Sequence, residues 1–280
     1  MKCSCRGILL KQEQIILLKG WWGIPGSRYL GDTMDISGIL KDWEYDPDNT
    51  IRIVTLEDER EVIQIRQPLG IEQYELNGRP DGQRPFQKES VLDEFLDRLD
   101  YYKILRSSDE NFVITHDEFK QLQEEAILFY FRYILMYQIG DYEKLERDTA
   151  HNLKICEIVE RYVENEKDKV EILQYRPYML KMNAIAKAMI QIQKKFKGVA
   201  RDILRSAIDL IKNIPEIDTP AFKMEKTRSI ETLSMTLKEL SGSDQSIVDK
   251  LQKELEEAVE VEAYERAAVL RDQIQTLRNQ

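Results

Sequence analysis

Apolar positions recur with a helical spacing through most of the chain. From residue 90 to the C-terminus they fall three or four positions apart, which is the pattern of amphipathic helices. Thr115 is followed three residues later by Glu118, and this pair predicts a capping box at a helix start. The segment 126–137 is apolar on all sides, so we expect it to be the buried centre of the helical part.

Glycine and proline divide this helical region into separate helices. The predicted breaks stand at Gly140, Pro177, Gly198 and Pro215. Helices separated by such short breaks predict antiparallel helical hairpins. A predicted helix over residues 220–240 precedes the sequence Ser-Gly-Ser-Asp at 241–244, which predicts a short hinge. Two further helices are expected over residues 246–279.

A pattern typical of β-strands precedes the helices. Residues 51–56, 61–66 and 71–76 predict three strands, and a polar connection of hairpin length joins the first two. The Asn-Gly and Asp-Gly pairs within residues 77–82 form a strong turn cluster. We therefore expect a small three-stranded meander. A short helix over residues 35–43, with Asp35 as its candidate N-cap, is predicted before it.

Together these patterns predict an α+β fold that is mainly α. We expect a small β-containing domain over residues 34–88, a helical scaffold over 89–240 and a terminal helical hairpin over 244–280. Residues 1–33 show no clean periodicity. They are either a loosely ordered extension or an upstream translation ahead of a true start at Met34, and the sequence leaves both interpretations open.

Two connections between helices resemble the tetratricopeptide repeat. Residues 138–145 are similar to the turn in the middle of that repeat, and Phe196 stands in the second connection where Tyr142 stands in the first. The family's period is about 34 residues, and Leu145 and Val199 occupy a position where it prefers alanine. The sequence therefore predicts either tetratricopeptide-like hairpins or an ordinary helical bundle.

Charge is distributed unevenly along the chain. Lys and Arg number 41 against 51 Asp and Glu, so the net charge is -10 and the chain is not a general polyanion binder. Residues 181–212 nevertheless hold eight cations and two acids. The cations are Lys181, Lys187, Lys194, Lys195, Lys197, Arg201, Arg205 and Lys212. This stretch is either a solvated helix face or a docking surface for nucleic acid or an acidic partner, with residues 194–205 as its centre, and we expect any nucleic-acid binding to be weak and electrostatic.

Several functional classes find no support in the chain. Three cysteines cannot form a disulfide framework and fit a reducing cytoplasm, and two histidines leave little scope for metal or acid–base chemistry. A phosphate-binding loop of the GxxxxGK[ST] type is absent. Paired acids such as Glu124 and Glu125 are interpreted as charge on an exposed helix face. We expect no catalytic, cofactor-binding or metal-binding residues.

The chain also lacks the signals of export and membrane insertion. Its most apolar stretch, residues 126–137, is too short to span a bilayer and carries Arg132 in its middle. Lys11, Glu13 and Lys19 interrupt the apolar runs near the N-terminus, and no small-residue cleavage site follows them. We therefore expect a cytoplasmic protein.

Two apolar stripes mark the C-terminal end. The first consists of Ile247, Leu251, Leu255 and Ala258, and the second of Ala263, Ala267, Leu270, Ile274 and Leu277. Each stripe has the spacing of a coiled-coil seam. Residues 260–262 are expected to form a tight turn between the two helices, with Ala267 and Ala268 allowing the backbones to approach closely.

This end of the chain resembles the UVR motif, a helical hairpin shared by the excision-repair proteins UvrB and UvrC. The residues that carry the resemblance are Ala258, Tyr264, Glu265, Ala267, Ala268, Leu270, Arg271, Asp272 and Ile274. The resemblance implies a module for protein–protein contacts, including contacts between two copies. The motif also occurs in activators of bacterial protein-arginine kinases and in Clp-protease adaptors. The zinc-binding cysteine pairs usual in the kinase activators are missing here.

A wider resemblance extends beyond this hairpin. Residues 43–47 and 69–82 are similar to segments that precede a helical region in a group of uncharacterised bacterial UVR-motif proteins. The similarity begins near Asp35, and it implies no known activity. It therefore bears on where the protein begins rather than on what the protein does.

The functional prediction is a non-enzymatic interaction protein that docks a partner through the terminal hairpin. The predicted contact residues are Leu251, Leu255, Ala258, Tyr264, Ala267, Ala268, Leu270, Arg271 and Ile274. The partner is of the excision-repair, Clp-adaptor or kinase type, and self-association is a further option. The alternative is a DNA-repair accessory factor whose basic face touches DNA. A third interpretation is an enzyme that uses the loop of residues 79–81.

Overall fold

The computed structural model describes residues 35–260 and 263–278, and the side chains of 241–249 and 276–278 are left out of that description. The chain divides into two compact units, Met1–Gln73 and Tyr74–Gln280. The predicted segment at 1–33 lies outside the described residues. The predicted domain limits at 88 and 244 remain predictions.

The first unit holds a small sheet and one short helix. Strands β1 (Ile51–Thr55), β2 (Glu61–Gln67) and β3 (Gly70–Glu75) follow one another in the order β1-β2-β3, which confirms the predicted meander. Ile51 lies opposite Ile65 in the antiparallel β1–β2 pair. Helix α1 (Ser37–Asp42) begins after Ile36 rather than after Asp35, whose carboxylate still accepts a hydrogen bond from the Ser37 backbone N–H at 2.9 Å.

A buried arginine ties this short helix to the sheet. The Arg66 guanidinium donates to the backbone carbonyl oxygen of Trp43 at 2.7 Å, to that of Gly70 at 3.2 Å and to that of Leu40 at 3.4 Å. It also donates to the carbonyl oxygen of Gln67. Few apolar side chains are buried in the described part of this unit, so it gains order from one polar side chain that satisfies carbonyl groups in several segments.

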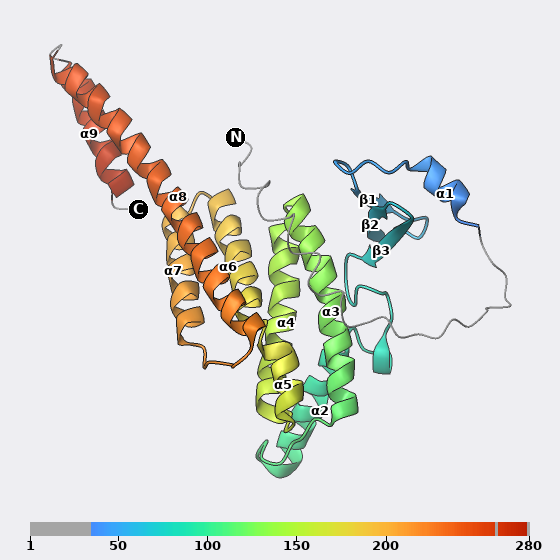
Figure 1. Ribbon diagram of the computed structural model, residues 1–280. Coiled ribbons are helices and arrows are strands. Elements are labelled where there is room, and N and C mark those ends of the chain that lie inside the picture. The colour runs from blue at the N-terminus through green and yellow to red at the C-terminus, as the bar shows by residue number, and fades with distance from the viewer. Residues whose placement is uncertain (1–34, 261–262, 279–280) are drawn as a thin grey trace. The chain divides into compact units, whose positions relative to one another are not determined.

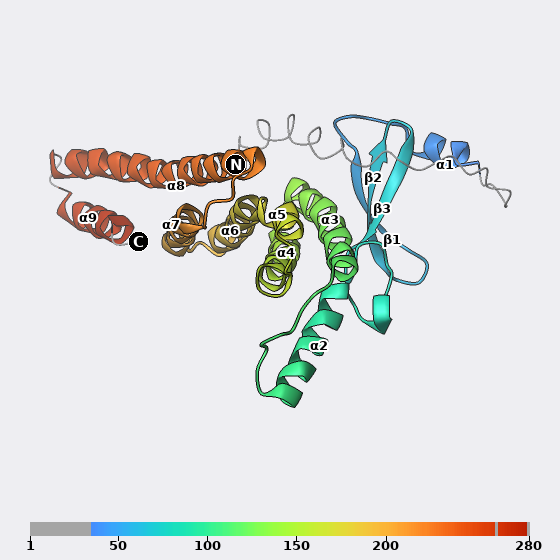
Figure 2. The same ribbon diagram turned by 60° about the horizontal axis from the view of Figure 1, so that its bottom comes forward.

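The second unit is helical apart from its first residues. It contains the 3-10 turn η4 (Pro85–Gln87) and the helices α2 (Val91–Arg106), α3 (His116–Ile139), α4 (Tyr142–Tyr162), α5 (Glu166–Leu173), α6 (Arg176–Gln193), α7 (Lys197–Asn213), α8 (Pro220–Glu260) and α9 (Tyr264–Arg278). Helices α3, α4, α6, α7 and α8 pack each against the next (Figures 1 and 2). The mainly helical α+β prediction is therefore confirmed.

Local sequence signals set the ends of several helices. The Thr115 hydroxyl and the Glu118 carboxylate form the predicted capping box at the start of α3. Ser90 and Asp141 accept hydrogen bonds from the backbone N–H groups of Asp93 and Lys144 and so cap α2 and α4. Gly140, at φ 79°, ends α3 in the left-handed region that glycine adopts at low cost.

Three predicted features of the helical part are wrong, and one helix was not predicted. Helix α5 was not predicted, and the break expected at Gly198 comes earlier, because Lys195 adopts φ 68° and Gly198 already lies in the first turn of α7. The hinge expected at residues 241–244 is helical. The segment 126–137 is only partly buried, since Ile127 and Phe131 are more than one third exposed.

Two hydrophobic clusters hold the helical array together. The first joins α2, α3, α4 and α5 around Phe95, Phe119 and Ile155. The second joins α6, α7 and α8 around Ala188, Leu204 and Leu233. The N-terminal half of α8 therefore belongs to the scaffold, and the same helix continues from it to the C-terminal hairpin (Figure 1).

Candidate functional site

The C-terminal hairpin closes along an apolar seam between α8 and α9. Ala258, Ala267 and Leu270 are buried in it. Leu251, Leu255 and Ala263 pack beside them, and Ile274 is buried as well. Small alanine side chains let the two helix backbones come close. The Ala263 backbone N–H donates to the Ala258 carbonyl oxygen at 2.9 Å where the chain turns back. Ile247 and Leu277 belong to the side chains outside the description.

The remaining predicted contact residues face away from this seam. Tyr264, Ala268 and Arg271 follow one another at i, i+4 and i+7, so they share one face of α9, and all three are exposed. Tyr264 exposes 67% of its surface. We call this the outer face of α9. The expectation that Ala268 supports close helix contact is wrong, because its neighbour Ala267 alone points into the seam.

Two exposed valines of the hairpin were not singled out in the sequence. Val259 on α8 and Val269 on α9 are both more than half exposed. Their signal in the sequence is that they are apolar residues off the stripe positions of an otherwise charged hairpin. Together with Tyr264 they leave apolar surface on the hairpin after its own seam is closed.

The basic stretch is more dispersed than its sequence suggests. The prediction that Lys181 belongs to an exposed basic surface is wrong. Lys181 is buried, and its ammonium group lies 4.2 Å from the centre of the Tyr178 ring. Lys187 pairs with Glu146 on α4 at 3.6 Å. Of the predicted basic positions, Lys194 and Lys195 lie exposed in the connection between α6 and α7, and the others at the centre of the patch follow on α7. They are Lys197, Arg201 and Arg205.

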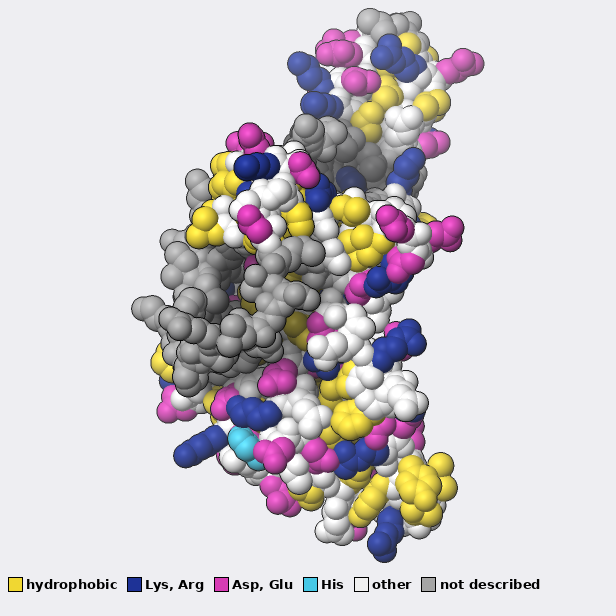
Figure 3. Space-filling view, turned by 90° about the vertical axis from the view of Figure 1, so that its right-hand side faces the viewer, with side chains coloured by type: hydrophobic (Ala, Val, Ile, Leu, Met, Phe, Trp, Pro, Cys, Tyr) yellow, Lys and Arg dark blue, Asp and Glu magenta, His cyan; other side chains and the backbone are white. Residues whose placement is uncertain are grey.

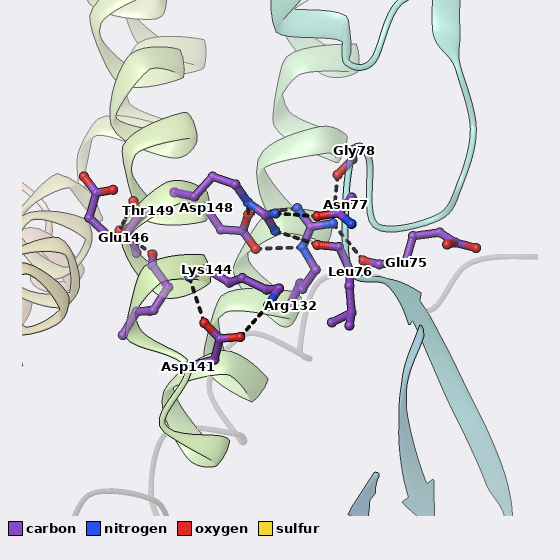
Figure 4. A network of polar contacts seen from close by, with 12 residues as sticks. Glu75, Leu76, Asn77, Gly78, Arg132, Asp141, Lys144, Glu146, Asp148 and Thr149 are labelled. Carbon is purple, nitrogen blue, oxygen red and sulfur yellow. Dashed lines mark hydrogen bonds and ion pairs between the residues drawn. The ribbon is translucent and has the colours of Figure 1, made fainter. Parts of the chain in front are cut away.

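A buried ion pair between α3 and α4 holds the first residues of the second unit, 75–78, against these helices (Figure 4). The Arg132 guanidinium, on α3, donates to both carboxylate oxygens of Asp148 on α4, at 2.7 and 2.8 Å. It also donates to the carbonyl oxygens of Glu75 and Gly78, each at 2.8 Å. Burial lowers the pKa of Arg132, and the hydrogen bonds and charge of Asp148 oppose that shift. The charges of Arg132 and Asp148 thus balance each other inside the protein.

A second arginine, Arg147 on α4, binds the same segment, residues 75–78. The Arg147 guanidinium donates to the Leu76 carbonyl oxygen at 2.8 Å, to the Asn77 side-chain oxygen at 3.1 Å and to Asp148 at 2.9 Å. The guanidinium groups of Arg132 and Arg147 thus satisfy one acceptor in each of the four consecutive residues 75–78. The turn cluster predicted at 77–82 therefore has a structural anchor in the helices.

Glu125 is buried, which contradicts its interpretation as exposed helix charge. Its carboxylate accepts hydrogen bonds from the backbone N–H groups of Val91 at 2.7 Å and Leu92 at 3.0 Å, the first residues of α2. His151 lies 3.1 Å from the same carboxylate. A carboxylate from α3 thus complements the positive end of the α2 dipole.

The loop proposed for an enzyme interpretation is engaged in the same network. The Arg79 side chain is mostly buried and pairs with Asp81 at 3.0 Å and with Glu125 at 3.4 Å. Cys156 is buried in the core, and burial raises the pKa of its thiol to about 12, so the thiolate does not form near neutral pH. Within the described residues, no group of three or more His, Cys, Asp or Glu side chains is placed to hold a metal ion.

An exposed apolar stripe occupies the end of α2. Tyr101, Ile104 and Leu105 lie at i, i+3 and i+4, and each is more than 60% exposed. Hydrophobic side chains gather at the lower end of Figure 3, the end at which α2 lies in Figure 1. Cationic and anionic side chains are intermixed over the rest of this face. Among the helices that the structure describes, none is long and apolar enough to cross a membrane.

These features define a helical array that carries a two-helix hairpin at residues 245–278 of the sequence, with exposed apolar side chains outside its seam. Residues 245–280 match the UvrB/uvrC motif, which is known as an interaction motif of DNA-repair proteins, so the hairpin is a UVR motif. Neither the curated proteins nor the solved structures contained a match to the chain. The motif match covers the part of α8 beyond the scaffold and all of α9.

Proposed function

We propose that this protein is a non-enzymatic adaptor that docks a protein partner on the outer face of α9. The observation that carries the proposal is the apolar surface that remains on the UVR hairpin after its seam is closed. On the outer face Tyr264 is 67% exposed, while Val259 on α8 and Val269 on another side of α9 are more than half exposed and add apolar surface elsewhere on the hairpin. Tyrosine is among the residues that dominate binding energy when a partner covers them.

The charged residues around Tyr264 fit the rim of such an interface. Arg271, on the same face, and the neighbouring Asp272 are exposed and lie 3.4 Å apart. Exposed pairs of this kind contribute little to folding. They are therefore available for partner contacts that set orientation and association rate.

The scaffold supports this role by carrying the hairpin on a continuous helix. The first half of α8 is packed against α6 and α7, and its last turns form the seam with α9. The hairpin is thus presented on a helix whose base is fixed in a hydrophobic core. A binding element on a rigid helix loses less conformational entropy on docking than one on a flexible linker.

The test is capture of partners from native cells by the full-length protein, followed by mass spectrometry. Tyr264→Ala should reduce recovery of the specific partners about tenfold or more, as for a central interface tyrosine. The matched control is Tyr101→Ala on α2, because Tyr101 is exposed to a similar extent, 64%. Circular dichroism should be unchanged in both variants, because neither side chain is buried.

The identity of the partners separates the adaptor from its alternative. Clp components or a kinase would support an adaptor, whereas excision nucleases would support a DNA-repair accessory factor, the class in which the motif is known. Equal recovery with Tyr264→Ala and wild type would refute docking on this face. Loss of self-association alone in that variant would assign the face to a second copy of the chain.

A further inference from the structure

The connection between α6 and α7 presents two lysines and a phenylalanine to solvent. Lys194 and Lys195 are exposed, and Phe196 exposes 58% of its surface. In the described part of the chain, neither of these two lysines forms an ion pair. Lys195 adopts φ 68°, a left-handed conformation in which glycine would be less strained. The connection therefore keeps a cation at a position where the backbone favours glycine.

Further cations continue this surface along α7. Lys197, Arg201 and Arg205 stand at i, i+4 and i+8, so they follow one side of the helix at intervals of about 6 Å. Asp202 is the one acid between residues 194 and 205, and it pairs with Arg205 at 3.1 Å. Five cations and one acid give this stretch a charge of +4 within a chain of -10.

Phe196 indicates which polyanion this surface suits. Surfaces that bind single strands combine cations that follow the phosphates with aromatic rings on which bases stack. In a duplex the faces of the bases are covered by their neighbours, so an exposed ring gains nothing by stacking. We propose that the α6–α7 connection and the adjoining side of α7 bind single-stranded nucleic acid, with a base stacked on Phe196. This activity does not depend on the proposed partner docking.

The test measures binding of the full-length protein to a fluorescein-labelled oligo-dT 12-mer by fluorescence anisotropy. Replacing both Lys194 and Lys195 by Ala should weaken binding about tenfold at 200 mM salt. It should also reduce the slope of log K against log salt by about 1.4, as expected for two lost phosphate contacts on a single strand. The matched control is Lys250→Ala with Lys253→Ala, a pair of exposed lysines on the hairpin.

An abasic 12-mer of the same length isolates the stacking contribution. Phe196→Ala should weaken oligo-dT binding about fivefold or more, the range for one stacked base, and should leave binding of the abasic strand unchanged. Phe196→Tyr should restore the affinity, because it keeps the ring. All of the altered side chains are exposed, so thermal unfolding should match that of the wild type.

Three outcomes would overturn the proposal. The first is no binding of oligo-dT at 50 mM salt. The second is an equal loss of affinity in the Lys250 and Lys253 control. The third is an equal effect of Phe196→Ala on oligo-dT, the abasic strand and poly-glutamate, which would identify a general acidic-partner surface instead.

Discussion

Replacing Arg132 by Met tests whether the buried ion pair holds the second unit together. Methionine fills much of the same volume but removes the charge. The substitution deletes two hydrogen bonds to Asp148 and one each to the carbonyl oxygens of Glu75 and Gly78. Asp148, with a fully buried side chain, then keeps only its contact with Arg147 among the ion pairs of the described residues.

The magnitude follows from which groups are left without partners. Removing one member of a buried ion pair costs about 3–5 kcal/mol. The retained Arg147 contact favours the lower end of that range, and two carbonyl groups that lose their donors add about 1 kcal/mol each. We therefore expect a loss of about 5 kcal/mol in the free energy of unfolding. For a unit of this size, this corresponds to a fall in Tm of about 10–20 °C.

The measurement is urea unfolding and thermal unfolding followed by circular dichroism. The control is Arg161→Ala, another arginine on α4, whose side chain is 65% exposed and pairs with Asp109. It should cost less than about 1 kcal/mol. The double substitution Arg132→Met with Asp148→Leu should recover part of the loss, because no buried carboxylate remains unpaired. A double variant as unstable as the single one, or a single variant as stable as the control, would refute this reasoning.

Three further changes have matched neighbours or a clear chemical readout. Glu125→Gln should lower the free energy of unfolding by about 1–3 kcal/mol in urea, since it weakens hydrogen bonds to the start of α2, whereas Glu124→Gln on the exposed side should have little effect. Ala267→Leu should overpack the seam, which lowers the stability of the hairpin by about 1–3 kcal/mol and speeds its proteolysis. Ala268→Leu should do neither, because Ala268 is exposed. In a variant in which Ser replaces Cys3 and Cys5, the Cys156 thiol should react with a disulfide reagent at pH 8 only after the protein unfolds, because burial raises the pKa of this thiol to about 12. Rapid labelling of the folded variant would contradict this.

Features that are set by residues close together in the chain could be predicted from the sequence. The Thr115 capping box, the Gly140 helix end and the three strands depend on local chemistry, and the structure contains them. The apolar stripes of the hairpin were also legible, because their spacing is regular over several turns. Sorting Ala267 from Ala268 required the phase of the seam, which the structure supplies.

Features that depend on residues far apart in the chain could not be predicted from the sequence. Glu125 looks like surface charge, but its partners are backbone N–H groups of Val91 and Leu92, more than 30 positions earlier in the chain. Lys181 looks like part of a basic face, but it is buried beside the Tyr178 ring. The prediction of a hinge at 241–244 is wrong because one glycine lowers the stability of a helix by only about 1 kcal/mol. The packing of α8 on both sides of that segment outweighs this cost.

The unbroken run of α8 gives the scaffold and the hairpin a common rotational phase. Each residue inserted within residues 241–249 would turn the outer face of α9 by about 100° about the α8 axis and move it by about 1.5 Å. An insertion of seven residues would return the face to within about 20° of its original direction, two turns further out. The length of this segment therefore sets the direction in which the hairpin meets its partner, and lengths that differ by single residues present different faces.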